Sequence, residues 1–375
     1  MKWFTHAIVR TTAPHKLIGA LYRTILRPVL FKFDASRVHR GAVAVGEYLE
    51  NRRAIVQFFC GRTVRKPKTV LGISFANPVG LAAGFDYNGH LAKVLPAVGF
   101  GFTTVGTVTA RPSSGNPGKQ LVRLPKSQAI LVNKGFKSDG AIAVAARLDK
   151  KQLEKQTLGI SIGSSNVSAV NTVPKAIDDY LETFSLFQAK PYVSFFELNV
   201  SCPNTALTET FSEPENFIAL VRAVTTLGIR QPLFVKMPSE ITVPNAEVLV
   251  RIALQYGIRG FIFSNLVKNR HSAAFDAVEI AALAGQPGNF SGRPTALQSH
   301  ALVAHMRQVF GSEVALVSCG GIFSSADAQA RFASGADLVQ LITGMIYEGP
   351  QLINEIVEKI DGGLPNVQGR CLEVG

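Results

Sequence analysis

The chain has 375 residues, 47% of them hydrophobic, and a formal net charge of +13. This length suits one large domain with an attached segment, because α/β barrels commonly run to about 250 residues as one unit. Its four cysteines, Cys60, Cys202, Cys319 and Cys371, lack the spacing of a zinc site or of a dense disulfide framework, so we expect no metal site and a reducing compartment.

The first predicted element is a basic helical extension over residues 1–68. It carries 14 Lys and Arg against three acidic residues, a net +11, which leaves about +2 for the rest of the chain. The run Leu17–Phe31 interleaves apolar and cationic side chains at helical spacing, which is typical of a helix that lies in a membrane interface. No run reaches the roughly 18 apolar residues of a spanning helix, so we expect no transmembrane segment. No small-residue cleavage site follows a hydrophobic core, so we expect no signal peptide.

We expect the extension to contact an anionic membrane surface. The protein would then be a peripheral membrane protein, on the cytoplasmic face of the cell membrane if the source is bacterial. The alternative is a helical hairpin that packs on the main domain and exposes a solvated basic face. Nucleic acid is not an expected partner, because little aromatic or Gly-rich patterning accompanies the charge.

From Val70 onward, short apolar runs alternate with helical stretches, which is typical of parallel βα units. Eight strands are predicted, at Pro78–Ala83, Phe102–Val108, Leu158–Gly163, Phe195–Val200, Pro232–Met237, Gly260–Asn265, Glu313–Cys319 and Leu338–Thr343. Helices between them include Asn216–Leu227, Ala246–Tyr256, Leu297–Val309 and Ala326–Ala333. Eight repeats favour a closed (β/α)8 TIM barrel over residues 69–363, followed by a tail over 364–375. An open doubly wound sheet is the alternative, because strand count alone does not prove closure.

In such a barrel, the catalytic and binding residues lie at the carboxyl ends of the strands. The residues predicted there are Ala83, Gly84, Thr107, Ser161, Asn199, Lys236, Ser264, Asn265, Gly320, Gly321, Thr343 and Gly344. The last two pairs fall where barrels often bind phosphate through backbone amides. Together with Gly292 in the loop before them, they favour a cofactor with a phosphate tail.

Lys236 lies inside the apolar run Pro232–Met237, where an unpaired charge would be costly. It either pairs with a structural carboxylate or stabilises the anionic reduced form of an electron-rich cofactor ring. Its place at a strand end favours the second interpretation.

The most informative stretch is Phe195–Thr205, an apolar strand that breaks at Pro203. Because proline cannot continue the hydrogen-bond ladder, Cys202 should lie on a loop just past the strand. A buried structural cysteine is the alternative. Asn199 and Asn204 on either side each offer a donor and an acceptor, as recognition of a flat polar ring requires.

Several motifs together resemble dihydroorotate dehydrogenase, in particular its quinone-dependent, membrane-associated class. They are Asn77–Asp86, Gly106–Pro112, Asn133–Phe136, Asn199–Thr205, Ser291–Pro294 and Cys319–Ile322. The basic extension, in which Leu30–Asp34 leads to His39, also resembles that class, whose helical extension forms a membrane-facing quinone tunnel.

The resemblance implies an FMN enzyme of pyrimidine biosynthesis that oxidises dihydroorotate to orotate and passes the electrons to a membrane quinone. In the family's mechanism a base on the fourth-strand loop takes a proton from C5 of dihydroorotate while hydride passes from C6 to N5 of FMN, and Cys202 occupies the position of that base. Substrate contacts then fall on Asn133, Gly135, Phe136, Asn199, Asn204 and Asn265. Flavin contacts fall on Ala83, Gly84, Thr107, Ser161, Asn199, Lys236, Ser264, Gly292, Gly320, Gly321, Thr343 and Gly344. His39 and Arg123 match positions that line the quinone approach.

The chain also departs from that class. Tyr87 stands in place of a lysine, Ser161 of an asparagine, Leu266 of a threonine and Ile342 of a tyrosine. The class normally uses serine as the base, whereas cysteine belongs to the soluble classes. A thiol, with a reference pKa of about 8.5, makes a deprotonated base more accessible than a hydroxyl does. A related FMN oxidoreductase with another substrate or acceptor, and a non-catalytic flavin-binding homologue, are therefore the alternatives.

Overall fold

The computed structural model describes residues 14–201 and 211–360. Eight parallel strands close into a barrel in the order β10-β12-β13-β3-β4-β7-β8-β9, which confirms the predicted TIM barrel and excludes the open sheet. The strands are β3 (Val79–Leu81), β4 (Phe102–Val108), β7 (Leu158–Ile162), β8 (Val193–Asn199), β9 (Leu233–Lys236), β10 (Gly260–Phe263), β12 (Ala315–Cys319) and β13 (Leu338–Leu341). Each is a short apolar run that is buried almost throughout, as strands covered on both faces require.

Most of these strands end one or two residues before their predicted ends. Ser264 and Asn265 follow β10 as a loop, and Thr343 is the first residue of helix α13 (Thr343–Glu348) instead of the last of its strand. These polar residues therefore lie at the rim beyond the regular strands, although the Ser264 amide still donates to the Cys319 carbonyl of β12 at 3.1 Å.

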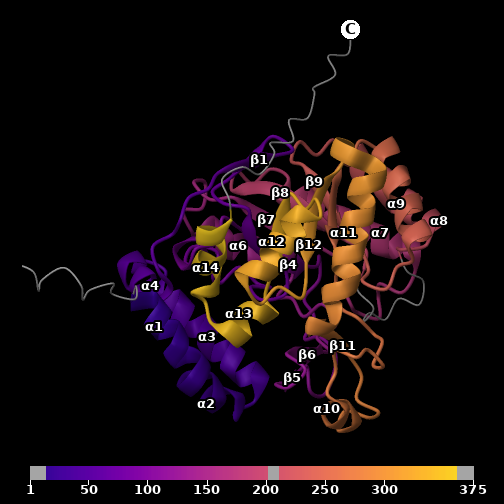
Figure 1. The fold of residues 1–375 in the computed structure, drawn as a ribbon. Helices are drawn as coiled ribbons and strands as arrows, with labels where there is room; N and C mark the ends of the chain where they lie inside the picture. Colours follow the sequence, from indigo (N-terminus) through magenta and orange to yellow (C-terminus); the bar gives the residue numbers. More distant parts are fainter. Residues whose placement is uncertain (1–13, 202–210, 361–375) are drawn as a thin grey trace, which may run out of the picture.

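Helices surround the barrel (Figure 1). They are α5 (Leu95–Val98), α6 (Ala141–Asp149), α7 (Val173–Phe187), α8 (Pro214–Thr226), α9 (Val243–Gln255), α11 (Ala296–Phe310), α12 (Ser325–Ala333) and α14 (Leu352–Lys359). The four predicted helices correspond to α8, α9, α11 and α12, with ends that differ by at most three residues. The predicted βα alternation is thus confirmed.

Three short strands outside the barrel were not predicted. β5 (Leu121–Leu124), β6 (Ala129–Val132) and β11 (Asn289–Gly292) form an antiparallel sheet in the order β11-β6-β5. β5 and β6 pair as a local hairpin in the loop after β4, whereas the pairing of β11 with β6 joins that loop to the one after β10 and is long-range. The sheet lies beside α10 (Ala277–Ala281), where Phe290 and Phe275 pack edge to face at 4.7 Å.

A hairpin closes the amino-terminal end of the barrel. It consists of β1 (Lys68–Val70) and β2 (Ile73–Phe75), and Phe75 packs against Phe102 with ring centroids 4.9 Å apart. Phe195 continues this ring cluster, and a Cβ atom on Gly159 would meet its ring at 2.3 Å. Bulky rings at this end therefore fill the barrel, and glycine on a neighbouring strand makes room for them.

The extension is helical, as predicted, with α1 (Pro14–Leu21), a π-helical turn η1 (Tyr22–Leu26), α2 (Arg27–Phe31), α3 (Ala35–Leu49) and α4 (Arg53–Cys60). These indigo helices gather against one side of the barrel, next to α13 and α14 (Figure 1). In the part of the chain that the structure describes, no helix is long and apolar enough to cross a membrane.

Backbone carbonyls dock the extension on the barrel. The Tyr22 hydroxyl donates to the Ile346 carbonyl at 2.6 Å, and Arg27 donates to the Tyr347 carbonyl at 2.9 Å. In the opposite direction, Arg123 of the barrel donates to the carbonyls of Leu30 and Phe33 at 3.3 and 2.9 Å. Each contact joins residues that are at least 90 positions apart in the sequence, so the extension and the barrel form one packed unit.

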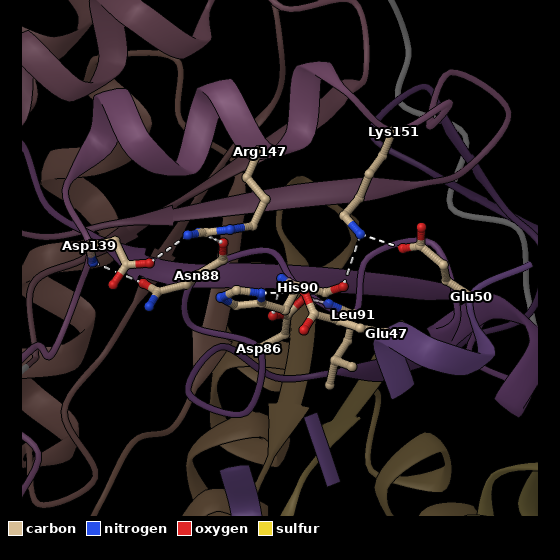
Figure 2. Close-up of polar contacts among 9 residues, drawn as sticks. All are labelled: Glu47, Glu50, Asp86, Asn88, His90, Leu91, Asp139, Arg147 and Lys151. Atoms are coloured by element: carbon tan, nitrogen blue, oxygen red, sulfur yellow. Dashed lines mark hydrogen bonds and ion pairs between the residues drawn. The ribbon is translucent and has the colours of Figure 1, made fainter. Parts of the chain in front are cut away.

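Charged side chains of α3 add a second set of contacts (Figure 2). Glu47 accepts a hydrogen bond from Nδ1 of His90 at 2.6 Å, and Glu50 pairs with Lys151. The Lys151 ammonium also donates to the His90 carbonyl at 3.1 Å, while Asp86 accepts from the backbone amides of His90 and Leu91. The loop that follows β3 is therefore held from both the extension and the barrel.

We predict that Asn354→Ala destabilises the protein strongly. Its buried amide nitrogen donates to the carbonyls of Cys60 and Val98 at 2.8 and 3.0 Å, so the change leaves buried acceptors unpaired. A loss of about 2–4 kcal/mol in the free energy of unfolding is expected, measured by equilibrium denaturation with urea. The exposed Asn171→Ala is the matched control and should change the free energy by less than about 0.5 kcal/mol. Equal effects of the two substitutions would contradict this role of Asn354.

Candidate active site

A cleft opens where several barrel strands end. Nine of the predicted site residues line it together: Ala83, Lys236, Ser264, Asn265, Gly292, Gly320, Gly321, Thr343 and Gly344. Leu266 and Ile342, two of the positions that depart from the resembled class, line the same cleft. Residues that lie more than 250 positions apart in the sequence thus meet in one hollow, as the carboxyl ends of parallel barrel strands should.

Gly320 and Gly321 offer backbone amides to this cleft. Both have positive φ angles, 107° and 71°, and a Cβ atom on Gly321 would lie 2.4 Å from the Cβ of Ala296. Neither amide donates to another protein group within the described residues. Glycine is therefore required here by conformation and by space, and the two free N–H groups suit an anion such as a phosphate.

Lys236 is the last residue of β9 and only 4% exposed, although it lines the cleft. No carboxylate of residues 14–201 or 211–360 lies within ion-pair distance of its ammonium. A pairing with a structural carboxylate, one of the two interpretations of this residue, is thus not observed there. A buried cation without a counterion favours a negatively charged ligand in the cleft.

A chain of hydrogen bonds runs along the rim from β7 to the loop after β10. The hydroxyls of Ser161 and Thr107 are 3.0 Å apart, and the Asn199 amide donates to the Thr107 hydroxyl at 2.9 Å. Ser201 donates to the Asn199 side-chain oxygen at 3.0 Å and accepts from the Asn265 amide at 2.7 Å. Ser201, which was not among the predicted site residues, therefore links two of the predicted amides and fixes how they face.

A second group of predicted residues lies on the loop after β6. The Asn133 side-chain oxygen accepts from the Asn116 amide at 2.8 Å, and the Gly135 carbonyl accepts from the Asn166 amide at 3.0 Å. A Cβ atom on Gly163 would lie 3.0 Å from the ring of Phe136 and 2.7 Å from Thr107, so both side chains pack on the end of β7. This loop therefore lies beside the hydrogen-bonded rim.

One further predicted residue, Gly84, lies beside the end of β4. Gly84, with a φ of 115°, donates its amide to the Gly106 carbonyl at 2.7 Å, which places it at the end of β4. Cys202 and Asn204 lie outside the described residues. Ser201, the last described residue before them, is hydrogen-bonded to Asn199 and Asn265.

His39 and Tyr87 connect the extension with the loop after β3. The Nε2 of His39 donates to the Phe85 carbonyl at 2.8 Å, and its ring stacks on Tyr87 with centroids 5.6 Å apart. Lys134 places its ammonium 4.1 Å from the centroid of the Tyr87 ring. Where the resembled class has a lysine, this chain therefore has a tyrosine that contacts a lysine from another loop.

The surroundings of this stack change two pKa values. Burial, followed by the charge of Lys134, lowers the pKa of His39 to about 4, so the imidazole is neutral at physiological pH. Burial likewise lowers the pKa of Lys134 to about 8. Lys134 was not predicted, although it stands inside the motif Asn133–Phe136 that pointed to its neighbours. Arg123, the other residue of the predicted quinone approach, packs on the Phe31 ring of the extension at 4.8 Å.

Comparisons with known proteins agree with this geometry. The profile of the dihydroorotate dehydrogenase family matches residues 67–364. A protein of Alkalilimnicola ehrlichii named dihydroorotate dehydrogenase (quinone) is 37% identical over 90% of this chain and 98% of its own length. A protein of the same name from Stenotrophomonas maltophilia is 34% identical over 90% of this chain and 95% of its own. The crystal structure of DHODH from Eimeria tenella in complex with ferulenol superposes with a TM-score of 0.74 at 26% identity, over 92% of this chain and 93% of the other.

We predict that Lys134→Met raises the pKa of His39, because it removes the cation that opposes protonation of the imidazole. The value should stay below the ordinary 6.5, because burial is the larger cause. The measurement is a pH titration of the His39 ring followed by NMR. Lys190→Met, at a half-buried lysine that pairs with Asp149, is the control and should leave the titration unchanged. An unchanged His39 pKa in Lys134→Met would show that the two side chains do not interact.

Proposed function

This chain belongs to the dihydroorotate dehydrogenase family, and we propose that it catalyses the FMN-dependent oxidation of dihydroorotate to orotate in pyrimidine biosynthesis, with a quinone as electron acceptor. The observation that carries the proposal is the cleft, in which two glycine amides and a buried lysine meet that have no partner among residues 14–201 and 211–360. A phosphate tail and a ring that becomes anionic on reduction are the two features of FMN that such a cleft would bind. The relatives named for this reaction extend over 90% of the chain.

The residues present fit FMN. The amides of Gly320 and Gly321, together with Thr343 and Gly344, would hold its phosphate. Ala83, Gly84, Thr107, Ser161, Asn199, Ser264 and Gly292 would complete its surroundings. When bound, FMN supplies the acceptor for the hydride that leaves C6 of dihydroorotate. The Lys236 cation would offset the negative charge of the reduced ring.

The amide-rich rim would hold the substrate. Asn133, Asn199 and Asn265 each have a hydrogen-bonded side chain, so their donors and acceptors are fixed in direction before the substrate arrives. Asn204, Gly135 and Phe136 would complete the pocket. Cys202, as a thiolate, would take the proton from C5 of dihydroorotate, and C6 loses hydride, so the substrate gives up two electrons and two hydrogens in all.

The electrons would leave toward the extension, which we assign to residues 1–68, with the barrel over 69–363 and a tail over 364–375. His39 and Arg123 would line the quinone approach, because both join the extension to the barrel. Exposed apolar side chains on these helices support peripheral contact with an anionic membrane, on its cytoplasmic face in a bacterium: Leu17, Leu21, Ile25, Leu26, Val29, Phe33, Val45, Tyr48, Ile55, Phe58 and Phe59.

We predict that the purified protein contains FMN and that dihydroorotate bleaches the flavin absorbance under anaerobic conditions. The rate of bleaching should rise with pH as the Cys202 thiol ionises. Cys202→Ala should lower that rate by about a hundred- to ten-thousand-fold, because it removes the base. Cys202→Ser should keep partial activity, with its pH dependence displaced upward, because a hydroxyl is the weaker acid. Stopped-flow absorbance measures all of these rates.

Cys60→Ala is the matched control, because this thiol lies buried at the end of α4 in the extension and burial raises its pKa to about 12. It should bleach at the parent rate. Flavin that dihydroorotate does not reduce would refute the proposed reaction. A loss of less than about tenfold in Cys202→Ala would leave the reaction in place and reject Cys202 as its base.

A separate prediction concerns the membrane. Ile25→Glu and Phe58→Glu should each weaken binding to vesicles of phosphatidylglycerol and phosphatidylcholine by about tenfold, because these side chains are 60% and 61% exposed on the extension. Leu297→Glu, at a position 86% exposed on α11 of the barrel, is the control and should bind like the parent. Vesicle co-sedimentation provides the measurement. Unchanged binding in both variants would favour a hairpin that only packs on the barrel.

A further inference from the structure

Arg331 lies behind the glycine pair of the cleft and takes part in none of the roles assigned above. It is on α12, at 3% exposure, and its Nη2 donates to the Gly320 carbonyl at 3.3 Å. Its Nη1 is buried and has no hydrogen-bond partner in the described part of the chain. The buried guanidinium thus donates one hydrogen bond to the backbone of the cleft through Nη2, while Nη1 has no acceptor among the described residues.

The charge of Arg331 is not neutralised by an ion pair. Asp327, one turn earlier on α12, instead pairs with Arg293 at 3.1 Å and accepts from the Phe323 amide at 2.9 Å. No other carboxylate of the described residues lies within ion-pair distance of Arg331. Burial also lowers the pKa of Arg331, which reflects the cost of holding this cation away from water. Such a cost is normally offset by a negative partner.

The bond to Gly320 acts on the neighbouring amide as well. The carbonyl of Gly320 and the N–H of Gly321 belong to one peptide group, which is trans, so they point in opposite directions. Fixing the carbonyl toward α12 therefore directs the Gly321 N–H away from α12. Gly321 lines the cleft and its amide has no acceptor among the described residues. A cation on the carbonyl side also polarises the peptide and strengthens its N–H as a donor.

We propose that Arg331 is a positioning residue for the phosphate of the bound flavin nucleotide, acting through the Gly320–Gly321 peptide, and that it makes the site prefer a phosphorylated flavin to an unphosphorylated one. The phosphate dianion would be the anionic partner that Arg331 otherwise lacks. The two charges would be separated by one peptide group, in a medium of low dielectric constant in which their attraction is strong. The inference rests on the proposed function, because it takes FMN as the cofactor.

The test compares two ligands that differ only in the phosphate. The flavin-free protein is titrated with FMN and with riboflavin, and binding is followed by quenching of flavin fluorescence. The dissociation constant of riboflavin divided by that of FMN isolates the contribution of the phosphate, because a folding defect weakens the binding of both ligands together. This ratio should fall by about tenfold or more in Arg331→Met and by less in Arg331→Lys, which keeps the charge but not the planar group.

Arg307→Met is the matched control. This arginine also binds backbone carbonyls, those of Gly335 and Val314, but it is neutralised by Asp337 at 2.6 Å. Its substitution should lower stability and leave the ratio of the riboflavin to the FMN dissociation constant at the parent value. If Arg331→Met does not fold, Arg331→Lys and Arg331→Gln decide through the same ratio, which should be at least about threefold below the parent value in both.

A parent ratio retained in the Arg331 variants would overturn the role of Arg331 and leave the proposed function intact. Equal affinity of the parent protein for FMN and riboflavin would also overturn it, because the site would then not use the phosphate. Failure of the parent protein to bind either flavin would instead refute the proposed function itself.

Discussion

Closure of the barrel is the constraint on which the candidate site depends. β13 pairs with β3 and β9 pairs with β8, so every strand has two parallel neighbours and all carboxyl ends share one rim. Lys236, the Gly320–Gly321 pair and Ala83 meet there because of this topology, although no short stretch of sequence joins them. The phenylalanine cluster at the opposite end fills the barrel, and the cleft opens at the rim.

Cations without carboxylate partners concentrate at this rim. Lys236 and Arg331 are buried, and Lys134 contacts the Tyr87 ring instead of an acid. At the other end of the barrel, by contrast, Lys68 and Arg307 share the carboxylate of Asp337. Lys236 and Arg331 thus lack an ion pair among the described residues, whereas Arg293 next to the cleft pairs with Asp327. The net charge does not reveal these unpaired cations, because the barrel as a whole is almost neutral.

The barrel and most of its rim could be predicted because their signals are local. A buried parallel strand is a short apolar run, and a polar residue or glycine after it marks the rim, as with Asn199 and Gly320. The antiparallel sheet of β5, β6 and β11 could not be predicted, because it depends on two loops that meet only in the folded chain. Arg331 could not be predicted for a related reason. An arginine near the end of a surface helix is ordinarily solvated, and only the packing of α12 in the structure buries this one behind Gly320.

The contacts that dock the helical extension have a consequence for how this protein can change over time. Tyr22, Arg27, Arg123 and Asn354 all bind main-chain carbonyls on the other side of the interface. A carbonyl is supplied by every residue type, so these anchors do not require particular side chains at Leu30, Phe33, Ile346 or Tyr347 as acceptors. The outward face of the helices can therefore drift in sequence while the position of the extension on the barrel stays the same.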